Sequence, residues 1–126
     1  MKALAIASLL LAASPALADV SIVDNHKTVK VDCSKDKTAT ILGNENTITL
    51  TGTCSLVSVA GNKNTVKADT ATKLDVAGND NTASVTASDQ ISVPGSRNTV
   101  TWKKGASGKA PAVSNPGKDN KVSQAK

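Results

Sequence analysis

The chain has almost no aromatic residues: among its 126 residues there is no Phe and no Tyr, and Trp102 is the single Trp. This composition excludes a compact core built on aromatic side chains. Histidine and cysteine are nearly as scarce, with only His26, Cys33 and Cys54. A metal centre or an acid–base site needs several such groups close together. The apolar residues that remain are Val, Ile, Leu and Ala, which suit strands packed in thin layers.

The N-terminal segment has the pattern of a signal peptide. Lys2 precedes an apolar stretch from Ala3 to Ala13, and Ala16-Leu17-Ala18 has the small-x-small form of a cleavage site. The apolar stretch is too short for a transmembrane helix, which takes ~20 residues. We therefore expect residues 1–18 to be removed before Asp19, leaving a periplasmic or secreted protein without a transmembrane segment.

The positive charge of the chain is confined to its C-terminal end. Residues 19–102 contain eight Lys and Arg against nine Asp and Glu, so this part carries −1. Residues 103–126 contain six Lys and one Asp and carry +5. A nucleic-acid-binding domain would need a basic stripe with aromatics or a known module, so we expect no nucleic-acid partner. A Lys-rich end could instead attract anionic envelope polymers, or it could only keep the terminus soluble.

The dominant feature of the sequence is a five-residue motif that occurs four times at intervals of 18, 17 and 17 residues. Its copies are GNENT at 43–47, GNKNT at 61–65, GNDNT at 78–82 and GSRNT at 95–99. Degenerate copies precede and follow these, at Asp24 and at Gly117. Irregular terminal units are typical of stacked repeats, because the terminal units cap the stack.

Apolar and polar residues alternate on both sides of each motif, as in Ile48 and Leu50 after the first copy and Val57 and Val59 before the second. This period of two predicts strands with one buried face. A unit of 17 residues cannot bury that face alone, but stacked copies can. The sequence thus predicts an all-β protein, a single-domain β-solenoid of about five to six coils of 17–22 residues. A small antiparallel β-sandwich with hairpins at the corners is the alternative.

We expect the domain organisation to follow the repeats. Residues 19–102 form the repeat domain, 103–112 a basic Gly/Pro loop, and 113–126 a degenerate last repeat and tail. Within that last part Val113 matches Ile91 and Val122 matches Val100. The alternative is that all residues after Trp102 are disordered. Trp102 itself has the inward parity, and we expect it to cap the end of the core.

The residues that recur from copy to copy of the motif predict a structural turn between strands. Gly tolerates positive φ, as does Asn, so we expect both of the first two motif residues to be left-handed. The second Asn has the inward parity, and stacking would form an Asn ladder that satisfies its own amides and the turn backbone. Lys27 takes this slot in the first unit. The turn glycines are Gly43, Gly61, Gly78, Gly95 and Gly117, and the ladder residues are Asn46, Asn64, Asn81, Asn98 and Asn120.

The residue before the second motif asparagine varies in type and changes sign between copies: Glu45, Lys63, Asp80, Arg97 and Asp119. We interpret this variation as that of a solvated corner, since a reaction would need the same residue each time. His26 occupies the corresponding position of the first unit and lacks partners with ligand spacing. We therefore expect no catalytic, cofactor or metal site.

Export predicts a disulfide between Cys33 and Cys54; two buried free thiols are the alternative. Neighbouring coils would bring their Cα atoms within about 5 Å of one another, inside the usual disulfide range.

The tandem GN-x-NTV units, TGTC at 51–54, NTVTWKKG at 98–105 and the late NPGKDNKVS resemble a bacterial exported family, domain of unknown function 3060. The resemblance covers nearly all of the mature chain and implies an envelope or secreted protein without an assigned activity. We expect a non-enzymatic structural or interaction protein. The alternatives are a glycan- or lipopolysaccharide-binding module or adhesin subunit, and an enzyme acting on polysaccharides. Such an enzyme would need a carboxylate pair from the scattered Asp69, Asp75, Asp80 and Asp89.

Overall fold

The computed structural model describes residues 19–125, except for the side chains of residues 35 and 36. The expected signal peptide, residues 1–18, lies outside the described residues. The described chain is all-β and contains eight strands and no helix. The strands are β1 (Val20–Ile22), β2 (Thr28–Ile41), β3 (Thr47–Val59), β4 (Thr65–Val76), β5 (Thr82–Ser92), β6 (Thr99–Lys104), β7 (Ala112–Ser114) and β8 (Lys121–Gln124).

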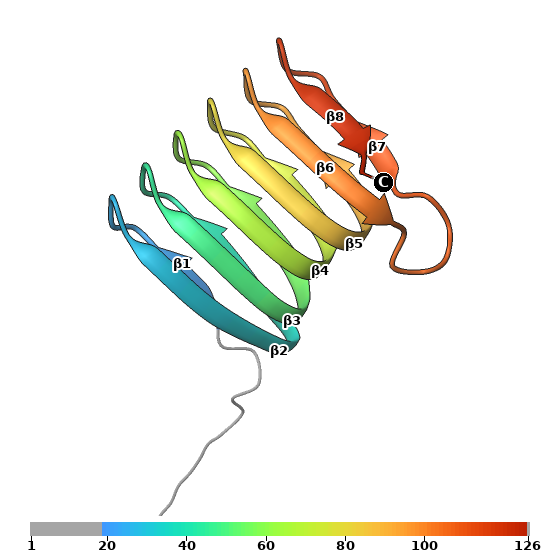
Figure 1. Ribbon diagram of the computed structural model, residues 1–126, viewed down its shortest axis with the longest axis horizontal. Helices are drawn as coiled ribbons and strands as arrows, with labels where there is room; N and C mark the ends of the chain where they lie inside the picture. The colour runs from blue at the N-terminus through green and yellow to red at the C-terminus, as the bar shows by residue number, and fades with distance from the viewer. Residues whose placement is uncertain (1–18, 126) are drawn as a thin grey trace, which may run out of the picture.

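The strands stack as a parallel β-solenoid of about six turns, as the repeat predicts. Each long strand runs along one side of the column, bends, and returns on the other side, so that one strand makes most of a coil (Figure 1). All strand pairs are parallel, in the order β1-β2-β3-β4-β5-β6-β8 with β7 beside β5. The antiparallel sandwich is therefore wrong.

The repeat sets the register between coils. Thr47 pairs with Thr65 and Thr65 with Thr82, so equivalent residues of successive motifs lie directly above one another. Because side chains alternate along a strand, this register places every inward apolar residue on the next. Ile48, Val66 and Val100 are among the fully or almost fully buried side chains of the resulting core.

The core is a thin aliphatic column between the two sides of each coil. It is closed by residues from both arms, for example Leu50 on the first arm and Val57 and Val59 on the returning arm. Burying such a side chain stabilises the fold by about 1.5–3 kcal/mol relative to leaving it exposed. One coil alone cannot bury its apolar side chains, so this stabilisation requires that the neighbouring coils are also folded.

The C-terminal part continues the stack. Val113 pairs with Ile91 and Val122 with Val100, the partners expected from the repeat. The loop between β6 and β7 spans residues 105–111 and is shorter than the expected 103–112, because Lys103 and Lys104 still belong to β6. Its backbone is tied to the coil below, since the Ser107 N–H donates to an Asp89 carboxylate oxygen at 2.8 Å.

Candidate functional site

The second asparagines of the motif form one column through the corners. The Asn81 Nδ2 donates to the Gly61 carbonyl at 2.9 Å, and its Oδ1 accepts the Asn64 backbone N–H at 2.9 Å. The side chain of Asn81 is only 1% exposed. Each asparagine of the column makes these two contacts to the coil before it: Asn46, Asn64, Asn81, Asn98 and Asn120. At the first corner Lys27 receives such a contact through its backbone N–H.

The motif glycines are required for close stacking and not for their φ angle. A Cβ added to Gly61 would lie 1.7 Å from the Gly43 carbonyl oxygen, and one added to Gly78 would lie 1.7 Å from that of Gly61. Among the described residues, positive φ occurs in glycine only at Gly52 and Gly108. The expectation that the motif glycines adopt positive φ is therefore wrong; a β-carbon is excluded there by the backbone of the neighbouring coil.

The left-handed residue of each corner is the variable one between the asparagines. Lys63 has a φ of 55° and Asp80 a φ of 57°, and the equivalent residues of the other corners have nearly the same angle: His26, Glu45, Arg97 and Asp119. A non-glycine residue pays a steric cost in this region. The corner accepts that cost because the glycine is needed two residues earlier, where a side chain has no room.

The first asparagines of the motif form a second ladder, which the sequence reasoning missed because it assigned them left-handed φ. The Asn79 backbone N–H donates to the Asn62 Oδ1 at 3.2 Å, and the Asn79 Nδ2 donates to the same oxygen at 3.1 Å. Asn62 and Asn44 repeat these contacts toward the N-terminus. This outer ladder is exposed or half-exposed, and it ends where Ser96 replaces asparagine.

The variable positions also form a column of their own, and their charges alternate along it from Glu45 onward. From the first corner to the last the residues are His26, Glu45, Lys63, Asp80, Arg97 and Asp119. The regular order of acidic and basic residues at this position can be seen in the sequence, but interpreting the position as a freely variable corner misses it. Opposite charges on neighbouring coils attract, while a slip by one coil would place like charges together.

The best-formed ion pair of this charge column joins Asp80 and Arg97. The Arg97 Nε and Nη2 donate to the two Asp80 carboxylate oxygens at 2.9 and 3.0 Å. These hydrogen bonds lower the pKa of Asp80, with a further contribution from the charges of Arg97 and Lys63. The same hydrogen bonds raise the pKa of Arg97. Both groups are exposed to solvent, which screens the pair.

His26 takes part in this column and in no metal cluster. Its Nε2 lies 3.6 Å from a Glu45 carboxylate oxygen, and both side chains are largely exposed. The described part of the chain has no group of three or more His, Cys, Asp or Glu that could hold a metal ion.

The scattered acidic residues have separate structural environments. An Asp69 carboxylate oxygen accepts the Gly52 N–H at 3.3 Å, and Asp89 accepts the Ser107 N–H. Asp80 pairs with Arg97 at the corner, and Asp75 lies on the returning arm of β4. The structure does not gather these four residues at one place.

Cys33 and Cys54 form a disulfide, as expected, with Cα atoms 5.1 Å apart. The bond joins β2 to β3, which are the first two long strands of the stack. Both cysteines are fully buried, so the bond lies inside the column, where the register between these strands shifts.

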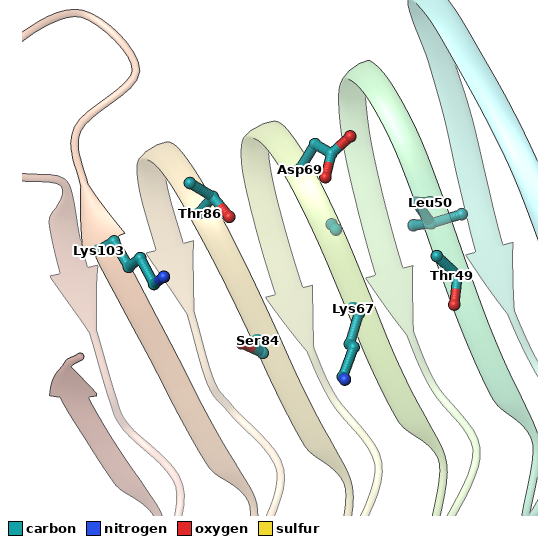
Figure 2. Close-up of a pocket in the computed structure, with 8 residues that line it drawn as sticks. Thr49, Leu50, Lys67, Asp69, Ser84, Thr86 and Lys103 are labelled. Atoms are coloured by element: carbon teal, nitrogen blue, oxygen red, sulfur yellow. The ribbon is translucent and has the colours of Figure 1, made fainter. Parts of the chain in front are cut away.

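A shallow depression of about 300 Å³ lies on the first arms of β3 to β6. Figure 2 shows its outward side chains on adjacent coils, with Lys67 on β4, Ser84 and Thr86 on β5, and Lys103 on β6. Two ammonium groups and several hydroxyls therefore surround the hollow. Asp69 contributes one carboxylate, and Leu50 and Ala68 form part of the floor.

Trp102 packs against the end of the core without being fully buried. It stacks on Val85 of β5 and pairs with Gln124 of β8. The inward parity of Trp102 predicts this position near the C-terminal end of the column.

One protein-family model matches the chain over residues 41–89 and 72–119, which together make up more than half of it. Its description is "Protein of unknown function (DUF3060)". A search of curated proteins and a search of solved structures gave no match. The described residues include no helix with the length and hydropathy needed to cross a bilayer.

Proposed function

The chain belongs to the DUF3060 family of proteins of unknown function, and from this premise we propose that it is an exported, non-enzymatic structural or interaction protein of the bacterial cell envelope. The observation that supports export is the buried Cys33–Cys54 disulfide between two coils. Structural disulfides persist in oxidising compartments and are rare in the cytosol. The signal-peptide pattern of residues 1–18 points to the same compartment.

A structural role is supported by what the polar motif residues do. The buried asparagine column uses its amides on the backbone of the preceding coil, and at the corners Glu45 lies against His26 and Asp80 pairs with Arg97. These side chains are thus engaged in holding the column together. The product is a stiff rod that presents Thr, Lys and Asp on its sides.

The test follows the chain in a Gram-negative host by fractionation and intact mass. We expect a periplasmic or secreted product that begins at Asp19 and has two fewer hydrogens than the reduced chain, because its cysteines are bonded. An Ala18→Lys variant, which spoils the cleavage site, should keep residues 1–18. A cytosolic product that starts at Met1 and has free thiols would contradict export. Turnover of an envelope polysaccharide that is lost on Asp69→Asn would contradict the non-enzymatic assignment.

Binding of anionic glycans is a second candidate, favoured by the depression in Figure 2. Lys67 and Lys103 offer two positive charges, and neighbouring hydroxyls offer hydrogen bonds. The net charge of +5 on residues 103–126 would strengthen attraction to lipopolysaccharide or acidic polysaccharide.

Immobilised lipopolysaccharide and polyuronate are suitable probes for this candidate. Deleting residues 103–126 would remove β7 and β8, so substitutions are the better test. The double variant Lys67→Ala with Lys103→Ala should lose at least tenfold in apparent affinity, while Lys73→Ala, on the returning arm of β4, should bind normally. Equal binding by all three proteins would rule out the depression as the binding site.

A further inference from the structure

Each corner is joined to the next by the same three hydrogen bonds, in which the backbone of the earlier corner bonds to the asparagine side chain and to one carbonyl of the later corner. At the corner of residues 78–81, the Gly78 carbonyl accepts the Asn98 Nδ2, the Asp80 N–H donates to the Ser96 carbonyl, and the Asn81 N–H donates to the Asn98 Oδ1. These contacts have lengths of 2.9, 3.0 and 2.9 Å. The corners that begin at Asp24, Gly43, Gly61 and Gly95 repeat the pattern.

The last corner of residues 19–125 presents the same three groups, and no other coil of these residues meets them. Within residues 19–125, nothing contacts the Gly117 carbonyl, the Asp119 N–H or the Asn120 N–H in the way that the next coil contacts their counterparts. β8 is the last strand of the described sheet and pairs only with β6. Because alternate residues of a parallel strand bond to opposite neighbours, Val122 directs its backbone groups away from β6.

The same end of the column exposes apolar surface. Val113 of β7 is 44% exposed although its counterpart Ile91 is fully buried, and Val122 of β8 is only half-buried although its counterpart Val100 is fully buried. In every earlier coil these positions are covered by the following coil. The open C-terminal end comprises β7, β8 and the corner at Gly117–Asn120, and β7 and β8 lie at one end of the column (Figure 1). It therefore has both the polar and the apolar groups of an unfinished coil junction.

A second copy of the chain cannot complete this junction with its first coil. Asp24 stands where later corners have glycine, and a β-carbon at that position would lie about 1.7 Å from the carbonyl of a coil stacked below, as the later glycines show. Lys27 stands where later corners have asparagine and has no amide to offer. Unpaired strand edges that carry such residues avoid edge-to-edge association.

We propose that the open C-terminal end is a docking edge for an extended segment of a partner protein. The segment adds as a parallel strand on β8, in the manner of β-strand addition, and carries a Gly-x-x-Asn corner. Its glycine lies over Gly117 and its asparagine over Asn120. A basic residue before that asparagine would face Asp119 and continue the charge column. This proposal deepens the interaction role proposed above, but its test uses purified protein and does not depend on export.

The probe is a labelled peptide with the sequence of residues 61–68, GNKNTVKA, which supplies all these features. Fluorescence anisotropy should show saturable binding to the purified chain. Peptides with Gly61→Ala or Asn64→Ala should bind at least tenfold more weakly, because the first collides with the Gly117 carbonyl and the second lacks the amide. A Lys63→Asp peptide should bind more weakly than the parent peptide, because its carboxylate would face Asp119. The difference in affinity should be larger at low salt than at high salt, since salt screens the repulsion.

Two variants of the protein place the binding on β8. Val122→Pro removes the outward N–H. Val122→Ala removes two methyl groups but keeps that N–H, so it controls for any contribution of the valine side chain. Circular dichroism checks that both remain folded. Loss of binding in Val122→Pro with retention in Val122→Ala supports the docking edge. Absence of saturable binding, equal binding by the Gly61→Ala peptide, or end-to-end polymers of the chain in the ultracentrifuge would overturn it. None of these results bears on whether the chain is exported, so the two proposals fail independently.

Discussion

Asn79 and Asn81 lie two residues apart in one corner, and we expect very different costs for removing their side chains. Asn81 is buried and bonds to the Gly61 carbonyl and the Asn64 N–H. Asn79 is exposed, and its side chain makes one hydrogen bond, from Nδ2 to the Asn62 Oδ1. The residue type, the corner and the substitution to alanine are the same, so the two variants differ in burial and in one side-chain hydrogen bond.

The magnitude follows from the partners that each change leaves behind. A lost hydrogen bond costs about 1 kcal/mol net, but a buried partner left unsatisfied costs about 1–3 kcal/mol. Asn81→Ala leaves two such partners inside the corner, which gives a loss of about 3–5 kcal/mol on this scale. Water can replace the amide of Asn79 at the surface, so Asn79→Ala should cost about 1 kcal/mol or less.

The assay is urea unfolding at pH 7, followed by far-ultraviolet circular dichroism and by Trp102 fluorescence, with the disulfide intact. We expect Asn81→Ala to lower the unfolding midpoint strongly with little change in slope, because the exposed area on unfolding is nearly the same. Equal losses of unfolding free energy in the two variants, or a larger loss in Asn79→Ala, would contradict our view that the buried asparagine column is the principal polar connection between coils.

Other predictions concern the remaining contacts of the corner and the core. The double variant Cys33→Ser with Cys54→Ser should lower the free energy of unfolding by about 3 kcal/mol, the chain-entropy value for a loop of this length. A loss below about 0.3 kcal/mol would show that the disulfide does not stabilise the fold in this way. Gly78→Ala places its Cβ 1.7 Å from the glycine carbonyl of the coil before it, so we expect a loss of about 3 kcal/mol or more; a normal thermal midpoint would be inconsistent with the close stacking. Arg97→Gln should lower the melting temperature slightly at low salt and less at high salt. Because the folded-state pKa of Asp80 is lowered from 3.8, the contribution of this pair is complete above pH 3.8 and disappears as the pH falls through the lowered value; a difference between the two proteins that grows on acidification would contradict it.

The parts of the fold that depend on the repeat could be predicted from the sequence. A constant spacing with inward apolar residues fixes the register once stacking is assumed, which is why Val113 and Val122 were matched with the partners that they have. The disulfide was predictable for the same reason, since neighbouring coils bring Cys33 and Cys54 within bonding range.

The conformation of the corner could not be predicted from propensities alone. Gly and Asn tolerate positive φ, but the glycine of each motif is needed for close approach to a carbonyl in another coil, a contact between residues 17 to 22 apart. The left-handed angle then falls on the next available residue, such as Lys63 or Asp80. The depression on the first arms depends on side-chain sizes across several coils and has no signature in a single motif.

The most direct test of the stacked column is a pair of spin-label distances along the charge column. Labels at Glu45→Cys and Asp119→Cys span four coil steps, and labels at His26→Cys and Asp119→Cys span five, which gives backbone separations of about 19 and 24 Å at about 4.8 Å per coil. The native cysteines are bonded and would not react. We expect the second distance to exceed the first by about one strand spacing. Two equal distances, or a shorter second one, would contradict it.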